Sequence, residues 1–278
     1  MTFGSLFAGI GGMDLGLERA GMECRWQVEI DPFCRKVLAK HWPDVPKYED
    51  VIDVGKANLE AVDLICGGFP CQDISVAGRG AGISEGTRSG LWLEMFRIID
   101  ELRPQVAFLE NVSALLSRGL DTVLGDLAEV GYDAEWDCVP AAAVGAPHRR
   151  DRVFILAYSG GIRRVPRRAG ESLPRARIHG EARLAHPDSE RRPQLARAAE
   201  PVGTQFGCAE RRGETLDEYA AGCGQWSSEP DVGRVAHGVP ARVDRLRGLG
   251  NAVVPQVAEW IGRRIMEADG EHLAQEGE

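Results

Sequence analysis

The feature that most restricts the fold of this chain is a regular alternation of short apolar runs with stretches of helical spacing. Apolar runs begin near residues 3, 24, 62 and 105. Strands that alternate with helices in this way predict a parallel sheet with helices on both faces, so we expect an α/β fold. The same periodicity predicts helices at 32–41, 91–102, about 120–130 and 256–266, and further strands near 132–139 and 153–157.

Residues that can do chemistry follow each of the first four apolar runs. Gly9–Gly12 follow the first run, Glu29 the second, Cys71 the third and Glu110 the fourth. Because parallel strands place their carboxyl ends at one edge of a sheet, where ligands of open α/β sheets bind, we expect these groups to gather at one rim.

The first turn and the second strand are typical of a nucleoside-binding site. Glycines at 9, 11 and 12 allow the backbone to approach a ligand closely, and Glu29 ends the next strand, 20 residues after Gly9. A second-strand acid at this distance accepts hydrogen bonds from ribose hydroxyls in dinucleotide-binding folds. Asp50, after a further short strand, is able to accept from the amine of a purine or to cap a turn.

Cys71 lies on a stiff turn, in the sequence Gly67-Gly68-Phe69-Pro70-Cys71-Gln72. The two glycines end the strand abruptly, and Pro70 fixes one backbone torsion before the cysteine. Two interpretations stay open at this point. Cys71 is either a nucleophile presented at the edge of the sheet or one more small buried residue, as most free cysteines are.

Charged residues accompany the strand that begins near residue 105 and the strand near 153–157. Glu110 emerges from an apolar run, and a buried carboxyl is costly unless it is paired or functional. Arg150 and Arg152 precede the strand near 153–157, and on an extended chain they would share one face. Surface arginines before an edge strand are the alternative.

Charge is distributed unevenly along the 278 residues. The net charge is −9, yet residues 149–247 hold 19 arginines against 13 acidic residues, and only four of the 33 basic residues are lysines. Such a segment suits phosphates and guanine edges, although a solvated surface would have the same composition. The start lacks the features of a signal peptide or membrane span, and seven cysteines without a C-x-x-C pair indicate a cytoplasmic protein without a zinc site.

Taken together, these stretches resemble the C5-cytosine DNA methyltransferase family. The elements that carry the resemblance occur in the family's order and cover residues 1–158 and about 226–266: Phe7-Ala-Gly-Ile-Gly-Gly12, Gly68-Phe-Pro-Cys-Gln72, Glu110-Asn-Val112, Arg150-x-Arg152 and Gly250-Asn-Ala-Val-Val254. The resemblance implies a Rossmann-like methyltransferase sheet with helices on both faces and a small, loop-rich target-recognition region. It also implies a monomer that acts on double-stranded DNA, without metal, in a restriction-modification or related setting.

The resemblance assigns roles to individual residues. It implies that Cys71 is the nucleophile, Glu110 the acid at the base, and Arg150 and Arg152 the orienting partners. Residues implied to surround S-adenosylmethionine are Phe7, Gly9, Gly11, Gly12, Glu29, Asp50, Val51, Phe69, Leu91, Asn251 and Ala252.

The chain departs from the family pattern at two places, and rival functions stay open. His148 stands where the family usually has Gln, and no separate helix is recognisable before Gly250, so either 239–249 does its work or the recognition domain is abbreviated. A tRNA cytosine-5 methyltransferase is the nearest alternative. A nucleotide-binding oxidoreductase would leave Cys71 without purpose, and a catalytically dead DNA-binding module would not need Glu110.

We expect the chain to be divided in four. The divisions are a catalytic and cofactor-binding domain at 1–158, a target-recognition region at 159–225, a return to the catalytic domain at 226–270 and a frayed tail at 271–278.

Overall fold

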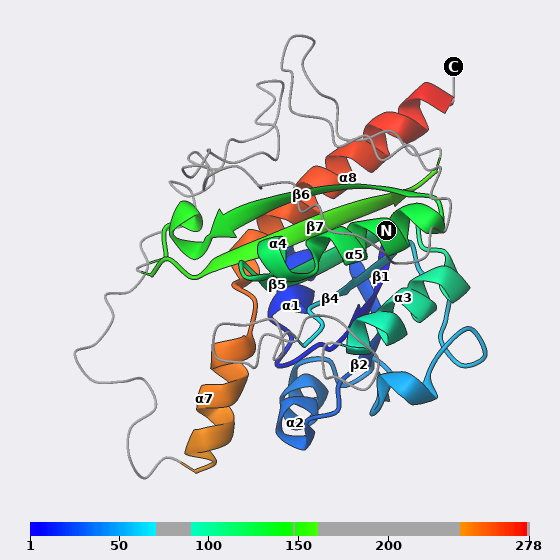
Figure 1. Cartoon of the computed structure of the whole chain (residues 1–278). Coiled ribbons are helices and arrows are strands. Elements are labelled where there is room, and N and C mark those ends of the chain that lie inside the picture. Colours follow the sequence, from blue (N-terminus) through cyan, green and yellow to red (C-terminus); the bar gives the residue numbers. More distant parts are fainter. Residues whose placement is uncertain (71–89, 147, 161–239, 277–278) are drawn as a thin grey trace, which may run out of the picture.

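The computed structural model describes residues 1–70, 90–146, 148–160 and 240–276, with side chains to residue 269. A seven-stranded sheet forms its centre, in the order β3-β2-β1-β4-β5-β7-β6 (Figure 1). The strands are β1 (Thr2–Leu6), β2 (Glu23–Val28), β3 (Lys47–Tyr48), β4 (Leu64–Gly67), β5 (Val106–Val112), β6 (Tyr132–Pro140) and β7 (Asp151–Ser159). The predicted α/β fold is confirmed.

The parallel pairing predicted for the strands that begin near residues 3, 24, 62 and 105 is confirmed, and of the later strands β7 runs in the opposite direction. β1 pairs in parallel with β2 and β4, β2 with β3, and β4 with β5, whereas β7 is antiparallel to both β5 and β6. A crossover helix is what enforces parallel pairing, but only a short 3-10 turn, Ala141–Val144, connects β6 to β7. Strand β7 therefore starts at the rim where the parallel strands end.

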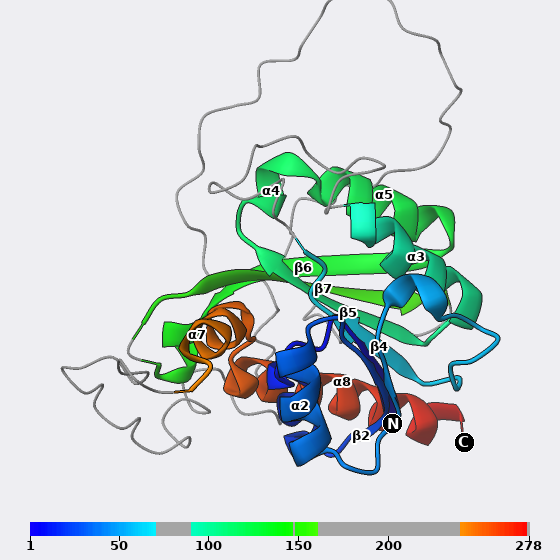
Figure 2. The same cartoon turned by 90° about the horizontal axis from the view of Figure 1, so that it is seen from below.

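Helices cover both faces of the sheet, as Figure 2 shows. The side chains of β4 alternate between two apolar layers, with Ile65 on the side of α3 and α5 and Cys66 on the side of α1, α2 and α8. The helices are α1 (Gly12–Arg19), α2 (Pro32–His41), α3 (Leu91–Leu102), α4 (Leu115–Arg118), α5 (Leu120–Glu129), α7 (Arg242–Asn251) and α8 (Pro255–Glu276), and a 3-10 turn, η1, spans Val51–Asp53.

The bounds predicted for α2 and α3 agree with the structure, because each helix has a clear signal at one end. Asp31 accepts hydrogen bonds from the backbone N–H groups of Phe33 and Cys34 and so caps the start of α2. Helix α3 ends at Leu102, with Arg103 as its C-cap and Pro104 directly after it.

Two elements at the C-terminal end differ from expectation. Helix α7 occupies 242–251, where the sequence shows no recognisable helix, and it includes Gly250 and Asn251. Its two glycines weaken the sequence signal, and packing of Gly248 against Ile10 favours it instead. Helix α8 runs to Glu276, ten residues beyond the expected end and into the tail at 271–278 that was expected to be frayed.

Helix α8 docks on α1 through small residues. A side chain at Gly16 would have its Cβ 2.5 Å from both the Cβ of Ala258 and the carbonyl oxygen of Pro255. Gly262 approaches Ala20 in the same way, at 2.9 Å. The two helices can pack this closely only because glycines lie at the contact, and so the C-terminal helix becomes part of the N-terminal fold.

Among the described residues, no helix is both long and apolar enough to cross a membrane. The proposed four-part division of the chain stays a prediction, because most of the target-recognition region at 159–225 lies outside the described residues. The expectations that the protein is a monomer and that it binds no metal also stay predictions.

We predict that Gly16→Val destabilises the protein by about 1–3 kcal/mol, since the new side chain overpacks the contact between α1 and α8. Chemical denaturation measures the free energy of unfolding. Gly125→Ala in α5 is the control, because its Cβ meets nothing within 4 Å and alanine favours a helix by about 0.5–1 kcal/mol. Equal effects of the two changes would contradict the close contact.

Candidate active site

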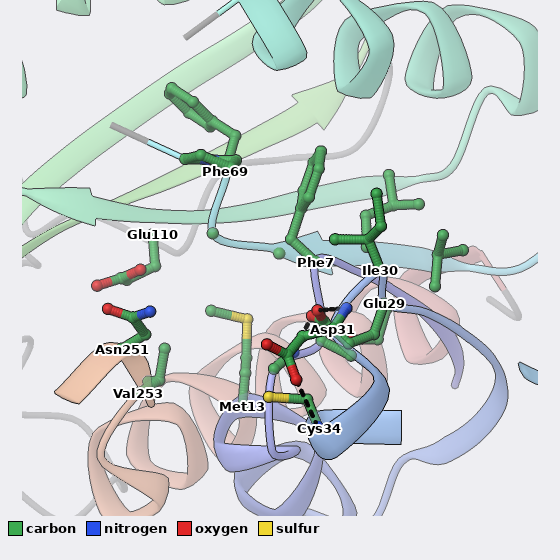
Figure 3. A pocket seen from close by; sticks show the side chains of 18 of the residues that line it. Phe7, Met13, Glu29, Ile30, Asp31, Cys34, Phe69, Glu110, Asn251 and Val253 are labelled. Carbon is green, nitrogen blue, oxygen red and sulfur yellow. Dashed lines mark hydrogen bonds between the residues drawn. The ribbon is translucent and has the colours of Figure 1, made fainter. Parts of the chain in front are cut away.

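One cavity of about 460 Å³ opens at the carboxyl edge of the parallel strands. This volume is in the range of small-molecule sites. Twelve of the fifteen predicted site residues line it: Phe7, Gly9, Gly12, Glu29, Asp50, Val51, Phe69, Leu91, Glu110, Arg152, Asn251 and Ala252. Figure 3 labels Phe7, Glu29, Phe69, Glu110 and Asn251 among them. The rim predicted from the ends of the strands is therefore one continuous space.

Three predicted site residues do not line this cavity in the described structure. Cys71 lies outside the described residues, although Pro70, directly before it, is in the lining. Gly11 has φ 82° and packs against Trp42, so it shapes the turn that leads into α1. Arg150 lies beside the cavity and contacts the segment that follows α7.

The glycine turn and Glu29 are joined directly at one end of the cavity. The backbone N–H of Gly9 donates to Oε2 of Glu29 at 2.7 Å, and that of Asp31 donates to Oε1 at 2.8 Å. Burial raises the pKa of Glu29, and these two hydrogen bonds oppose the rise. Each carboxylate oxygen keeps a free lone-pair direction for a ligand hydroxyl.

Two exposed apolar side chains flank the same end. Ile30 is 62% exposed and Ile52 is 61% exposed, which is unusual for side chains of this size, and both line the cavity. Large exposed apolar groups beside a cavity are typical of a ligand-binding surface. The sequence pattern predicted neither residue as part of the site. The available signal for Ile30 was its position between two carboxylates, Glu29 and Asp31.

Asp50 caps the 3-10 turn η1, which is one of the two roles that the sequence suggested for it. Its Oδ1 accepts a hydrogen bond from the backbone N–H of Ile52 at 3.1 Å. The side chain also lines the cavity, so capping and ligand binding are compatible.

The residues at this end fit S-adenosylmethionine. A Cβ built on Gly9 meets nothing within 4 Å, so there is open space beside a backbone with φ 58°. Glu29 offers acceptors for ribose hydroxyls, and Ile30 and Ile52 offer apolar surface for a purine ring.

Glu110 lies at the other end of the cavity, against the turn that leads to Cys71. A Cβ on Gly68 would be 2.6 Å from Oε2 of Glu110, so only glycine fits there without displacing the carboxyl group. The side-chain amide of the buried Asn111 donates to the carbonyl oxygen of Phe69 at 3.2 Å and holds the same turn. Phe69 packs against Trp92 of α3, with 5.2 Å between the ring centroids.

Arg152 reaches Glu110 because β7 is antiparallel to β5. The register pairs Val112 with Arg152, and the guanidinium Nε lies 2.8 Å from Oε1 of Glu110. Burial raises the pKa of Glu110 to about 7, and the positive charges of Arg152 and Arg150 oppose that rise without cancelling it. A carboxyl with such a pKa can hold or release a proton near neutral pH.

Arg150 does not share an extended face with Arg152, contrary to the expectation from sequence. Its backbone is left-handed, with φ 39°, and β7 begins one residue later. The guanidinium Nη2 donates to the carbonyl oxygens of Gly250 and Ala252, at 2.8 and 2.6 Å. Burial lowers the pKa of Arg150, and the neighbouring Arg152 adds to this effect.

The segment after α7 closes the cavity from the C-terminal side. The carbonyl oxygen of Val253 lies against Gly12 at the start of α1, where no side chain would fit. Arg247 lies 3.5 Å from Asp31, which links α7 to the start of α2. Met13, Arg247 and Val253 also line the cavity, although the sequence did not single them out. Met13 directly follows the glycine turn and Val253 lies within the Gly250–Val254 motif, whereas Arg247 lies in α7, for which the sequence gave no signal.

The strand order, the glycine turn joined to a second-strand acid and the buried glutamate define a Rossmann-like domain of the S-adenosylmethionine-dependent methyltransferase class. Residues 1–195 match the family model described as C-5 cytosine-specific DNA methylase. This match covers more than half of the chain, and the protein therefore belongs to that family, as its motifs indicated.

Curated relatives include type II methyltransferases. The chain is 38% identical over 161 residues to the type II methyltransferase M2.BsuMI of Bacillus subtilis (strain 168), covering 55% of this chain and 41% of that one. It is 32% identical over 166 residues to the type II methyltransferase M.HhaI of Haemophilus parahaemolyticus, covering 58% and 50%. The matched segment thus spans half or less of these two relatives.

The burial of Glu110 predicts a pH-dependent stability. In the unfolded chain the carboxyl has a pKa near 4.5, whereas burial raises the folded value to about 7, so the folded state holds a proton that the unfolded state releases between these pH values. The free energy of unfolding therefore falls as pH rises through this window, by roughly 3 kcal/mol for a shift of this size.

Glu110→Gln removes the titrating group, so the stability of the wild type relative to this variant should fall between pH 4.5 and pH 7.5. Urea denaturation of both proteins across this range measures the difference. Parallel curves for the two proteins would show that burial does not raise the pKa of Glu110.

Proposed function

We propose that the protein is a DNA (cytosine-5-)-methyltransferase that methylates C5 of a cytosine turned out of duplex DNA. The observation that carries the proposal is that Glu29 and Glu110 line one cavity. The acid proposed to bind the cofactor and the acid proposed to contact the cytosine therefore face the same space. Family membership and the type II relatives support the same chemistry.

The cofactor we propose is S-adenosylmethionine, held by Glu29 at the ribose, by Ile30 and Ile52 at the purine, and by the Asn251–Ala252 segment at the far end. When bound, it supplies an electrophilic methyl group on a sulfonium. The remaining steps fall to side chains of this protein.

Cys71 acts as the nucleophile. Cytosine C5 is a weak nucleophile, so the thiolate first adds to C6 and pushes electron density toward C5. We expect positive charge at this end of the cavity, where Arg152 is in the lining, to favour the thiolate over the thiol. After C5 has been methylated, loss of its proton restores the double bond and the C6–S bond breaks, which returns the thiolate.

Glu110 acts in its protonated form. Addition of sulfur to C6 places charge on the ring, and a carboxyl against N3 relieves it by donating a hydrogen bond or the proton. Its pKa of about 7 keeps part of the population protonated at neutral pH. Arg152, at 2.8 Å from the carboxyl, is placed to stabilise charge on O2 of the same ring.

Duplex DNA is the proposed partner, and 159–225 the region that reads it. C5 and C6 cannot be attacked within a stacked duplex, so the base must be turned out. The arginine-rich segment suits phosphate contacts and base edges. Arg150 would hold the Gly250–Ala252 segment, through its two hydrogen bonds, while the base is bound.

We predict that Glu29→Gln weakens binding of S-adenosylmethionine at least tenfold, since an acceptor to the ribose loses its charge. Isothermal titration calorimetry measures the dissociation constant. Glu60→Gln is the control, because Glu60 pairs with Arg25 on the surface and does not line the cavity. Unchanged affinity in Glu29→Gln would remove Glu29 from the cofactor site.

The function itself is tested with labelled S-adenosylmethionine and either mixed-sequence DNA or tRNA. We expect label in DNA, as 5-methylcytosine, and none with Cys71→Ser, which removes the thiolate. DNA that carries 5-fluorocytosine should trap a covalent protein–DNA adduct in the wild type alone. Label in tRNA only would favour a tRNA methyltransferase, and an adduct formed by Cys71→Ser would contradict the proposed nucleophile.

A further inference from the structure

The cofactor end of the cavity lies at the weakest edge of the sheet. Strand β3 has only two residues, and the last backbone hydrogen bond between β2 and β3 runs from the N–H of Glu29 to the carbonyl oxygen of Tyr48, at 3.1 Å. Beyond it the chain separates into two loops. One carries Ile30, and the other carries Asp50 and Ile52.

The side chain of Arg35, on α2, joins these two loops where the backbone pairing stops. Its Nη1 donates to the carbonyl oxygens of Glu29 and Ile30, at 3.0 and 2.8 Å. Its Nη2 lies 2.9 Å from Oε1 of Glu49, the residue directly before Asp50. One planar group with fixed donor directions thus sets the spacing between the loops.

The side chain of Arg35 is 23% exposed and that of Glu49 is 68% exposed, so the hydrogen bond to the carbonyl oxygen of Glu29 is partly buried, whereas the ion pair with Glu49 lies at the surface. Arg35 does not line the cavity, and it touches residues that do. Its positive charge also opposes the rise that burial causes in the pKa of Glu29, which favours the carboxylate that accepts from Gly9 and Asp31.

We propose that Arg35 is a positioning residue for the cofactor site: it holds the Glu29–Ile30 loop at a set distance from the Glu49–Ile52 loop, so that the ribose acceptor and the two exposed isoleucines present one preformed surface. This inference rests on the proposed function for the identity of the ligand. The clamp, by which we mean the contacts of Arg35 with Glu29, Ile30 and Glu49, does not depend on that identity. Figure 3 shows Glu29 and Ile30 in this part of the cavity.

The principal test compares Arg35→Gln with Arg25→Gln. Arg25 lies on β2 and makes two surface ion pairs, with Glu23 and Glu60, away from the cavity. We expect the dissociation constant of S-adenosylhomocysteine to rise about tenfold or more in Arg35→Gln, the effect of losing hydrogen bonds to a charged group, and to stay unchanged in Arg25→Gln.

Measuring KM and kcat separately distinguishes a positioning role of Arg35 from a general loss of protein stability. With labelled S-adenosylmethionine and mixed-sequence DNA, Arg35→Gln should raise KM for the cofactor and leave kcat within about twofold, because only binding is affected. Arg35→Lys keeps the charge but not the planar fork, and its affinity should lie between those of the wild type and Arg35→Gln.

Hydrogen exchange tests the clamp without any ligand. In Arg35→Gln the amides of residues 48–54 should exchange faster than in the wild type, and in Arg25→Gln they should not. If Arg35→Gln does not fold, Glu49→Gln replaces it, since this change breaks the same ion pair and should still raise both exchange and the dissociation constant. Because Glu49 itself lines the cavity, the exchange measurement then carries the test of Arg35.

The outcomes distinguish the two proposals. Unchanged exchange at residues 48–54 together with unchanged affinity in Arg35→Gln, or in Glu49→Gln if the first does not fold, would overturn the positioning role. A wild type that does not bind S-adenosylhomocysteine would instead overturn the proposed cofactor, and the exchange measurement would then decide the role of Arg35 alone.

Discussion

Parallel pairing of β1 with β2 and β4, and of β4 with β5, is the constraint on which the rest of the structure depends. Because these strands end at one edge, the turn at Gly9, the acid Glu29 and the acid Glu110 reach one cavity from distant parts of the sequence. The strands behind the edge are buried on both faces and hold the loops rigidly. The site is thereby built before a ligand binds, which lowers the ordering cost of binding.

The reversed strand β7 adds what the parallel strands cannot. Its amino end, not its carboxyl end, lies at the rim, and so Arg152 meets Glu110 across β5. Burial and the ion pair act on the carboxyl in opposite directions, and burial prevails, which leaves the pKa of Glu110 at about 7. A more exposed carboxyl would be charged at neutral pH and could not donate to a ring nitrogen.

The C-terminal segment completes a site that the N-terminal segment begins. Close packing of α8 on α1 through Gly16 and Gly262 fixes where the chain returns, and the carbonyl oxygen of Val253 then lies against Gly12. Arg150 binds the same segment from the other side, through Gly250 and Ala252. The segment from Gly250 to Val253 is thus held between the glycine turn on one side and Arg150 on the other. On the opposite wall of the cavity, Arg35 joins two loops in a similar way.

The sequence by itself determined the α/β class, helices α2 and α3 to the residue, and the groups at the ends of the parallel strands, because periodicity, caps and strand ends are local properties. It missed α7, whose two glycines hide a helix that tertiary packing favours, and it wrongly expected Arg150 and Arg152 to share a face. Only the tertiary structure decided the direction of β7, the exposure of Ile30 and Ile52, and the partners of Arg150 and Arg35. Each of these depends on contacts between segments far apart in the chain or on which surface the folded chain leaves uncovered, and no local pattern of residues encodes either.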